Sequence, residues 1–200
     1  MQSRKTDITR EKILDAAYGE IYRQGFQAAS IANILATTGL TKGALYHHFP
    51  AKQDLGLAVI KEVIRDGMQA MIFDYLRDSD DPFAALMELI QAKAEQASPE
   101  SVSLGCPLNN LMQEMSPLDE MFKNQLLQVL QTWQEVVADA LLRAQRQGRV
   151  RQDLDCNALA LFIVSAWEGC TGVAKNMQSV KNFHVCMHQL REFVRGLQAD

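Results

Sequence analysis

Residues 41–55 read TKGALYHHFPAKQDL, and this stretch decides how the rest of the chain is interpreted. A short apolar segment, residues 31–40, precedes it and ends in a glycine and a leucine. Ser30 suits the N-cap of a helix in that segment, and Thr41 suits the N-cap of a second helix over residues 42–48. Two brief helices joined by a turn with glycine are typical of a helix-turn-helix. Because the second helix is too short to be stable alone, we expect its neighbours to hold it and to present it to a groove.

The same stretch is similar to the recognition segment of the TetR family of bacterial transcriptional regulators. That family carries a pattern like K-G-x-x-Y-x-H-F followed shortly by a lysine, which here is formed by Lys42, Gly43, Tyr46, His48, Phe49 and Lys52. The preceding segment, TREKILDAAYGEIYRQGF over residues 9–26, also resembles the opening helix of the family. The specific match covers about the first quarter of the chain, and the remainder resembles the family in length and helical pattern.

The resemblance implies two sets of DNA contacts. In the major groove and on the adjoining backbone it implies Lys42, Gly43, Ala44, Tyr46 and His47, and on phosphates it implies Ser30, Thr41, Tyr46, His48 and Lys52. Physical chemistry agrees, because helix N-termini present free N–H groups to phosphate and a lysine can donate to guanine acceptors. A packed or capped surface imidazole is the alternative for each histidine.

Charge is distributed unevenly along the chain. The net charge of −4 divides into +3 over residues 1–65 and −7 over residues 66–200. A polyanion such as DNA would therefore be attracted to residues 1–65 and repelled by residues 66–200. Since +3 over 65 residues is also ordinary surface, this pattern supports DNA binding without establishing it.

Composition limits the location of the protein. No continuous run of about 18 apolar residues suggests a membrane span, and the first residues, MQSRKTD, lack the apolar stretch of a signal peptide. We therefore expect a cytoplasmic protein without a membrane partner. The four cysteines, at positions 106, 156, 170 and 186, have no CxxC spacing, so buried thiols are expected rather than disulfides.

Outward from the recognition segment, apolar periodicity and capping residues predict helices and no strands. The expected helices cover residues 9–24, 31–40, 42–48, 51–76, 82–97, 107–115, 118–147, 156–177 and 180–197, with a loop over 98–103. We expect an all-α fold of about nine helices. Residues 1–50 would form a three-helix DNA-binding domain with the helix-turn-helix, and residues 51–200 a larger helical domain for effector binding and dimerisation.

The rear of the chain is rich in methionine and large aromatic residues, which fill irregular cavities and adapt to apolar ligands. Ordinary core packing explains most of them. The resemblance implies a cavity for a small apolar or weakly polar effector, with these candidate contacts: Met68, Met71, Met87, Cys106, Asn110, Gln113, Phe122, Trp133, Phe162 and Trp167.

The last two predicted helices carry more apolar surface than one bundle face needs. A small-residue patch around Cys170 and a stripe of larger residues predict a four-helix interface between two copies of the chain. The candidate interface residues are Cys170, Phe183, Met187, Leu190 and Val194. Packing of the stripe within one subunit is the alternative.

Other chemistry has weaker support. Cys106 lies in a Gly-Cys-Pro stretch near an expected helix start, which would lower the pKa of its thiol, so an electrophile- or oxidant-sensing repressor is one alternative. His184 and His188 have a metal-binding spacing but no third ligand, so no metal and no cofactor are expected. No catalytic constellation is evident, and we expect no enzyme.

The sequence therefore predicts a ligand-responsive repressor that binds a palindromic operator as a homodimer and is released by a small-molecule inducer. Two further alternatives remain. One is a chromosome-organising DNA-binding protein that responds to no ligand, and the other is a small helical enzyme or carrier that uses the rear cavity.

Overall fold

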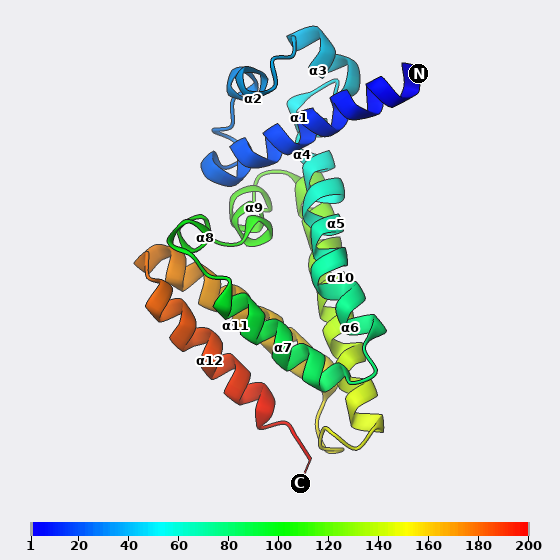
Figure 1. Cartoon of the computed structure of the whole chain (residues 1–200), viewed down its shortest axis with the longest axis vertical. Helices are drawn as coiled ribbons and strands as arrows, with labels where there is room; N and C mark the ends of the chain where they lie inside the picture. The colour runs from blue at the N-terminus through cyan, green and yellow to red at the C-terminus, as the bar shows by residue number, and fades with distance from the viewer. Residues whose placement is uncertain (1, 200) are drawn as a thin grey trace. The chain divides into compact units, whose positions relative to one another are not determined.

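The structure is a computed structural model that describes the backbone of residues 2–199 and the side chains of residues 8–199 (Figure 1). Over this range the chain forms helices joined by short connections, with no strand beyond an isolated bridge between Val150 and Gln198. The all-α class predicted from the apolar periodicity is confirmed.

The helices follow in chain order: α1 Gln2–Gln24, α2 Ile31–Thr38, α3 Lys42–His48, α4 Lys52–Ala58, the π-helical η1 Val59–Ile64, α5 Arg65–Met68, the π-helical η2 Gln69–Phe73, α6 Asp74–Asp78, α7 Pro82–Glu95, α8 Pro99–Leu104, α9 Pro107–Met115, α10 Glu120–Arg146, α11 Cys156–Met177 and α12 Val180–Arg195. The segments from α4 to α6 join without a break and correspond to the single long helix predicted over residues 51–76.

Two expectations are corrected. The first helix begins at Gln2 and not near residue 9. The loop expected over residues 98–103 is helical, as α8, because Ser98 caps it and Pro99 fits its first turn. The Ser98 hydroxyl accepts the Ser101 backbone N–H at 3.1 Å, which satisfies a donor that the helix start would leave free.

Contacts between residues divide the chain into two compact units. The first unit contains the residues up to Gly67 together with Asn110–Leu127, and the second contains Met68–Asn109 together with the residues from Gln128 onward. The first unit extends beyond residue 50 because α4 and η1 pack against α1. The division between DNA-binding and effector domains at residues 50 and 51 stays a prediction.

In the first unit, α1 packs against α2, α3, α4 and η1. The apolar stripe of α1 faces inward, with Ile13 and Ala17 fully buried. Leu45 is also fully buried and fixes the short α3, which could not persist without tertiary contacts. The Phe26 and Phe122 rings lie 4.5 Å apart between centroids, so the start of α10 belongs to this core.

In the second unit, α12 packs against α7, α8 and α11, and α11 also packs against α8. By length and composition alone α11 is apolar enough to cross a bilayer, but 44% of that stretch is buried inside the chain. A core helix of a soluble bundle passes the same test, and α11 has the contacts of one.

A disulfide joins Cys170 of α11 to Cys186 of α12, with their Cα atoms 5.5 Å apart. The expectation that all four cysteines are thiols is therefore wrong for this pair. Sequence spacing could not reveal it, because only the antiparallel packing of two separate helices brings the two positions together. Cys106 and Cys156 are free thiols.

Candidate DNA-binding site and effector cavity

The helix-turn-helix is formed by α2 and α3, and local hydrogen bonds fix both helix starts. The Ser30 hydroxyl accepts the Ala32 N–H at 3.2 Å, and the Thr41 hydroxyl accepts the Ala44 N–H at 3.2 Å. Gly39 ends α2 in a left-handed conformation with φ 69°, which a residue with a side chain rarely adopts. The predicted N-caps of both helices are confirmed.

Most of α3 is offered to solvent. Lys42, Gly43 and His47 are exposed, and Tyr46 is 44% exposed although it carries a large aromatic ring. Ala44 and His48 are half-buried, and His48 lies edge-on against His47. A helix of seven residues with one buried anchor therefore presents a lysine, a tyrosine and an imidazole on its outer side.

Gly43 has no structural reason to be glycine within the chain. A Cβ atom added there would meet only the Thr41 hydroxyl oxygen, at 3.8 Å, and the residue has ordinary helical φ. Glycine inside a helix costs about 0.5–1 kcal/mol relative to alanine. The absence of a side chain at this exposed position therefore favours close approach by something outside the chain.

Lys52 already has partners at the start of α4. Its ammonium donates to the Gln27 carbonyl oxygen at 3.0 Å and lies 4.8 Å from the centroid of the Phe26 ring. Because an ammonium has three N–H donors, a phosphate contact remains open to this half-buried side chain. The internal contacts hold the lysine close to the turn between α1 and α2.

That turn is also held by Glu114 of α9. The two carboxylate oxygens of Glu114 accept the backbone N–H groups of Phe26 and Gln27, each at 2.8 Å. Gly25 permits this approach, because it has φ 81° and a Cβ atom there would lie 2.8 Å from a Glu114 oxygen. The carboxylate thus fixes the chain just before the helix-turn-helix, a role that sequence reasoning missed.

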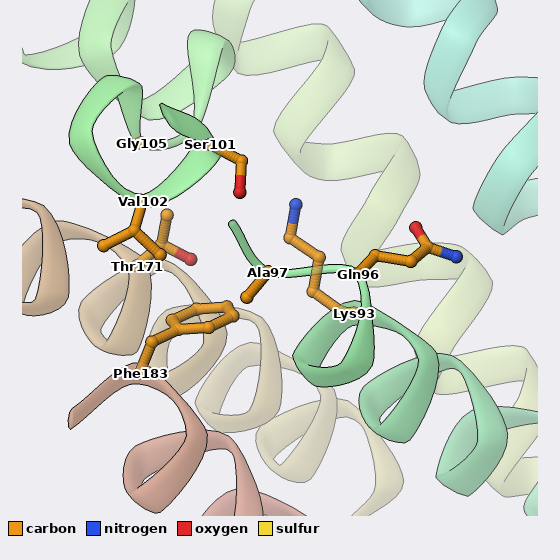
Figure 2. A pocket seen from close by; sticks show the side chains of 8 residues that line it. All are labelled: Lys93, Gln96, Ala97, Ser101, Val102, Gly105, Thr171 and Phe183. Carbon is orange, nitrogen blue, oxygen red and sulfur yellow. The ribbon is translucent and has the colours of Figure 1, made fainter. Parts of the chain in front are cut away.

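The second unit contains a cavity of about 170 Å³ among α7, α8, α11 and α12 (Figure 2). Polar and apolar side chains share its wall, which consists of Lys93, Gln96, Ala97, Ser101, Val102, Gly105, Thr171 and Phe183. Figure 2 shows Lys93 and Ser101 on one side, with Thr171 and Phe183 on another. This volume is below the range of about 300–1,000 Å³ that is typical of ligand pockets, so the cavity has room only for a small molecule.

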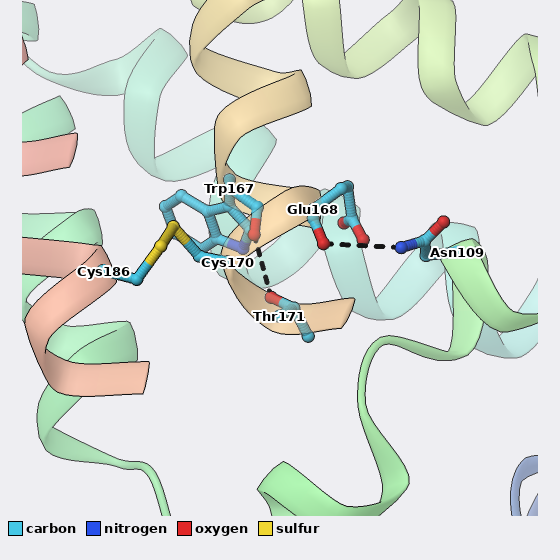
Figure 3. The surroundings of a disulfide bond; sticks show 6 residues. All are labelled: Asn109, Trp167, Glu168, Cys170, Thr171 and Cys186. Atoms are coloured by element: carbon cyan, nitrogen blue, oxygen red, sulfur yellow. Dashed lines mark hydrogen bonds between the residues drawn. A yellow bond between two sulfur atoms is a disulfide. The ribbon is translucent and has the colours of Figure 1, made fainter. Parts of the chain in front are cut away.

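A buried acid lies close to this cavity. Glu168 of α11 is 7% exposed, and neither of its carboxylate oxygens has a hydrogen-bond partner of acceptable geometry. The Asn109 amide donates instead to the Glu168 backbone oxygen, at 3.5 Å (Figure 3). Burial raises the pKa of Glu168, against smaller lowering effects from Cys106 and Lys93.

Burial has the same effect on Cys106. Burial, with a smaller contribution from the Glu168 charge, raises the pKa of the thiol to about 12, although N–H groups of Asn109 and Leu108 at the start of α9 act in the opposite direction. The lowering expected from a helix start is therefore present but outweighed by desolvation. At neutral pH this thiol is protonated and is a poor nucleophile.

Comparison with known proteins agrees with both units. The sequence model described as bacterial regulatory proteins, tetR family, matches residues 13–59, and the tetracyclin repressor-like C-terminal domain matches residues 82–190. The second match alone covers more than half of the chain.

The chain belongs to the TetR family of bacterial transcriptional regulators.

Individual relatives are consistent with this membership. The transcriptional regulator AcuR of Cereibacter sphaeroides is 31% identical, over 84% of this chain and 77% of AcuR. The HTH-type transcriptional repressor DhaR of a Mycobacterium species is 26% identical, over 80% of this chain and 79% of DhaR. The crystal structure of regulatory protein TetR from Rhodobacter sphaeroides superimposes with a TM-score of 0.80 at 29% identity, covering 92% of this chain and 98% of that one.

Membership settles the broad class of activity. The chain is a TetR-family transcriptional repressor, and regulators of this family bind DNA, act as dimers and are not enzymes. The prediction that the chain is no enzyme is confirmed.

The cavity in the second unit differs from the effector cavity predicted from the sequence. None of the ten candidate contacts lies in its wall. Met71 and Phe162 are 66% and 52% exposed, and Phe122 packs on Phe26 in the first unit, where Asn110 and Gln113 also belong. These five residues lie outside the cavity wall, and their role in effector binding stays a prediction. The remaining candidates, Met68, Met87, Cys106, Trp133 and Trp167, belong to the second unit and stay predictions.

The predicted dimer stripe is covered within the chain, and its role in an interface between two copies stays a prediction. Its members are buried within the single chain, at most 6% exposed, because they pack between α12 and its neighbours in the same subunit: Cys170, Phe183, Met187, Leu190 and Val194. Large apolar side chains that are exposed on the same two helices are Leu161, Phe162, Val173, Met177, Val185 and Phe193. Periodicity located the apolar faces of these helices but could not show which face was already covered.

The histidines of α12 have ordinary partners. His184 bonds with the Ala94 carbonyl oxygen through its Nε2 atom at 2.9 Å, and the His188 Nε2 atom lies 3.8 Å from a Glu192 oxygen. Over the part of the chain that the structure describes, no group of three potential ligands is placed to hold a metal ion.

Sequence reasoning missed Glu168, and a signal for it existed. The residue interrupts the apolar run of α11, and an acid at a core position of a helix is rarely buried without a purpose or a partner.

Proposed function

We propose that this chain is a ligand-responsive repressor that binds a palindromic operator as a homodimer and releases it when a small, weakly polar effector occupies the second unit. The observation that carries the DNA-binding part is the exposed face of α3 around Gly43. That residue lacks a side chain at a position where the chain itself has room for one.

In this proposal α3 lies in the major groove. The ammonium of Lys42 donates to base acceptors, and the Ala44 methyl and the Tyr46 ring approach the groove edge. The residues that contact the groove and the phosphates are those implied by the family pattern, namely Ser30, Thr41, Lys42, Gly43, Ala44, Tyr46, His47, His48 and Lys52. The capping hydroxyls of Ser30 and Thr41 use their acceptor function within the chain, so their hydrogens remain for phosphate oxygens.

Dimerisation would use the exposed apolar side chains of α11 and α12. Phe162 and Phe193, one from each helix, lie with ring centroids 4.8 Å apart and are 52% and 39% exposed. Aromatic residues are enriched at protein interfaces relative to the rest of the surface. Two copies joined there would present two α3 helices to the two halves of a palindrome, and a protein that acts on operator DNA works in the cytoplasm.

The effector would act by shifting a population between two conformers. Three continuous helical segments contain residues of both units and can carry the change: the segment from α4 to α6, α9, and α10. The second of these bonds through Asn109 to the Glu168 backbone and through Glu114 to the turn before the helix-turn-helix. An effector that moves α9 would therefore alter the support of α3.

The alternatives have less support. A thiol sensor at Cys106 is disfavoured by a pKa of about 12, which leaves little thiolate. A chromosome-organising protein that responds to no ligand would have no use for the cavity. A carrier would bind its ligand without any change in DNA affinity, so measuring both in one sample separates it from a repressor.

The test is the Gly43→Ala variant. Duplexes would first be selected from a random library by the wild-type protein, and an inverted repeat is the expected outcome. The added methyl should weaken binding to the selected duplex by about tenfold, because it obstructs close approach, while leaving the melting temperature equal or higher. Gly67→Ala, where a Cβ atom would meet nothing within 4 Å, is the matched control and should leave DNA binding unchanged. Equal affinity of the wild type and Gly43→Ala would remove the assignment of α3 to the groove.

A further inference from the structure

The disulfide between Cys170 and Cys186 links the two helices that carry the exposed apolar surface (Figure 3). Each cysteine has a neighbour in the wall of the cavity. Cys170 directly precedes Thr171, and Cys186 follows Phe183 by one helical turn. The bond therefore fixes the separation of α11 and α12 at the place where both helices line the cavity.

A permanent disulfide does not fit the proposed function, on which this inference rests. A protein that acts on operator DNA works in a reducing compartment, where glutathione and thioredoxin keep thiols reduced and disulfides are transient. In such a compartment, two cysteines this close together would be expected to exist as a dithiol or as a disulfide according to the local redox conditions. A fixed bond would belong to an exported protein instead.

We propose that Cys170 and Cys186 form a reversible oxidation site, with hydroperoxides as its oxidant, and that the disulfide state has low affinity for the operator.

The exposure of the two residues assigns their roles. Cys186 is half-buried, so a small peroxide can reach its sulfur, whereas Cys170 is only 6% exposed. The other two thiols are poorly placed for this chemistry. Cys156 is 3% exposed, and Cys106 is held protonated by its surroundings.

The reaction has two steps. The Cys186 thiolate attacks one oxygen of the hydroperoxide, the O–O bond breaks, and an alcohol leaves after taking a proton while Cys186 becomes a sulfenic acid. The Cys170 sulfur then attacks the Cys186 sulfur, the S–O bond breaks, and the hydroxyl leaves as water with the thiol proton. Two thiols lose two electrons and two protons in total, and the peroxide is reduced to an alcohol and water. A cellular dithiol reverses the change by exchange.

The change can reach DNA through both surfaces that the bond touches. Thr171 and Phe183 move with the two helices, so cross-linking changes the cavity wall. Val173 and Val185 are 59% and 56% exposed on the same helices, so cross-linking also changes the surface proposed to join two subunits. We expect the reduced state, which a reducing compartment maintains, to be the one that binds the operator.

The experiment uses the full chain, hydrogen peroxide as the oxidant and the inverted repeat selected by the reduced protein. Peroxide should remove two hydrogens from the protein, peptide mapping should place the bond between residues 170 and 186, and dithiothreitol should restore the dithiol. Oxidation should weaken binding to the selected duplex by about tenfold, within the range of ordinary allosteric couplings. Cys186→Ser should bind as the reduced wild type does and ignore peroxide. Cys106→Ser and Cys156→Ser should respond as the wild type does.

Several outcomes would overturn the proposal. A bond between two copies of the chain on a non-reducing gel would do so, as would unchanged affinity after complete oxidation, or loss of the response in Cys106→Ser. Cys170→Ala serves as a second variant that keeps the buried position apolar, and it too should be insensitive. Failure of the reduced protein to select any duplex would instead refute the proposed function itself.

Discussion

Carboxylates accept backbone N–H groups in both units of this repressor, as Asp155 does at the start of α11, but one buried acid in the second unit has different surroundings. In the first unit, carboxylates hold the backbone: Glu114 accepts two N–H groups of the turn at residues 26 and 27, and Asp54 accepts the Ala51 N–H at 2.9 Å. In the second unit, Glu168 is buried with neither carboxylate oxygen bonded. Within the described chain, the buried side-chain atoms that lack a partner belong to Glu168 and Arg191, both in the second unit.

The difference matches the two tasks. A unit that reads DNA must hold α3 in one orientation, and saturated hydrogen bonding rigidifies a structure. The second unit is proposed to respond to small molecules, which requires conformers of similar free energy, and an unsatisfied buried group beside a cavity destabilises the resting conformer. The following predictions run from the largest expected effect to the smallest. They test whether the first unit depends on close packing and complete hydrogen bonding while the second unit tolerates change.

The largest effect is expected from Gly56→Ala in the first unit. An added Cβ atom would lie 2.5 Å from Cε2 of Phe26 and 2.7 Å from Cζ of Phe122, and the Phe122 ring is fully buried. Neither ring can move without disturbing the other, so we expect a loss of about 2–3 kcal/mol in the free energy of unfolding. Urea denaturation at a fixed protein concentration measures it.

Gly169→Ala in α11 of the second unit is the matched control. Nothing lies within 4 Å of a Cβ atom there, so replacing a helical glycine should raise stability by about 0.5–1 kcal/mol. If Gly56→Ala and Gly169→Ala both stabilised the protein, the proposed difference in packing between the two units would be wrong.

Glu114→Ala should have the next largest effect. It leaves the N–H groups of Phe26 and Gln27 without acceptors, and because one is only part-buried and the other is exposed, we expect a loss of about 1–2 kcal/mol. Hydrogen exchange should show the specific change, as faster exchange at these two amides. Glu114→Gln keeps one carbonyl acceptor, so its stability should lie between that of the wild type and that of Glu114→Ala. Unchanged protection of both amides in the alanine variant would show that the carboxylate does not hold this turn.

The sequence predicted the first unit better than the second, for a physical reason. Helix caps act over three residues, so Ser30, Thr41 and the bounds of α3 followed from local rules. Contacts such as Glu114 with Phe26 join residues far apart in sequence, and no local pattern encodes them. In the second unit the apolar faces of α11 and α12 were recognised, but the choice between core and surface depends on packing against α7 and α8.

Glu168→Gln should stabilise the protein. Burial raises the pKa of Glu168, so between the unfolded value of 4.5 and the folded value the native state binds more protons than the unfolded state. Stability contributed by this group therefore falls as pH rises through that window. Cys106 and the Lys93 charge lower this pKa by smaller amounts. Glutamine cannot ionise, so we expect a gain of about 1 kcal/mol at neutral pH that vanishes in acid.

Unfolding measured between acid and neutral pH tests this sign. A variant that is less stable than the wild type at neutral pH would mean that the carboxylate has a partner in the native state. The Glu168 carboxylate would then be hydrogen-bonded as fully as the Glu114 carboxylate of the first unit, and the contrast between the two units would be lost.

The smallest effect is expected from the ion pair between Arg10 and Glu62 in the first unit. One guanidinium nitrogen lies 2.7 Å from a Glu62 oxygen, and the hydrogen bond from Arg10 lowers the pKa of Glu62, with burial opposing it. The sign is the reverse of that for Glu168: the stabilisation is present above 4.5 and is lost as pH falls through the lowered pKa. Since the two side chains are 35% and 33% exposed, solvent screens the pair, and it should be worth about 0.5 kcal/mol.

Arg10 also lies 5.0 Å from the centroid of the Phe49 ring, so its removal tests two contacts at once. A double-mutant cycle with Arg10→Met and Glu62→Gln isolates the ion pair, because Glu62→Gln leaves the arginine on the ring. The coupling energy should be present at neutral pH and absent in strong acid. A coupling that does not change with pH would show that uncharged packing joins these residues, and the opposite pH responses of the two glutamates would no longer distinguish the units.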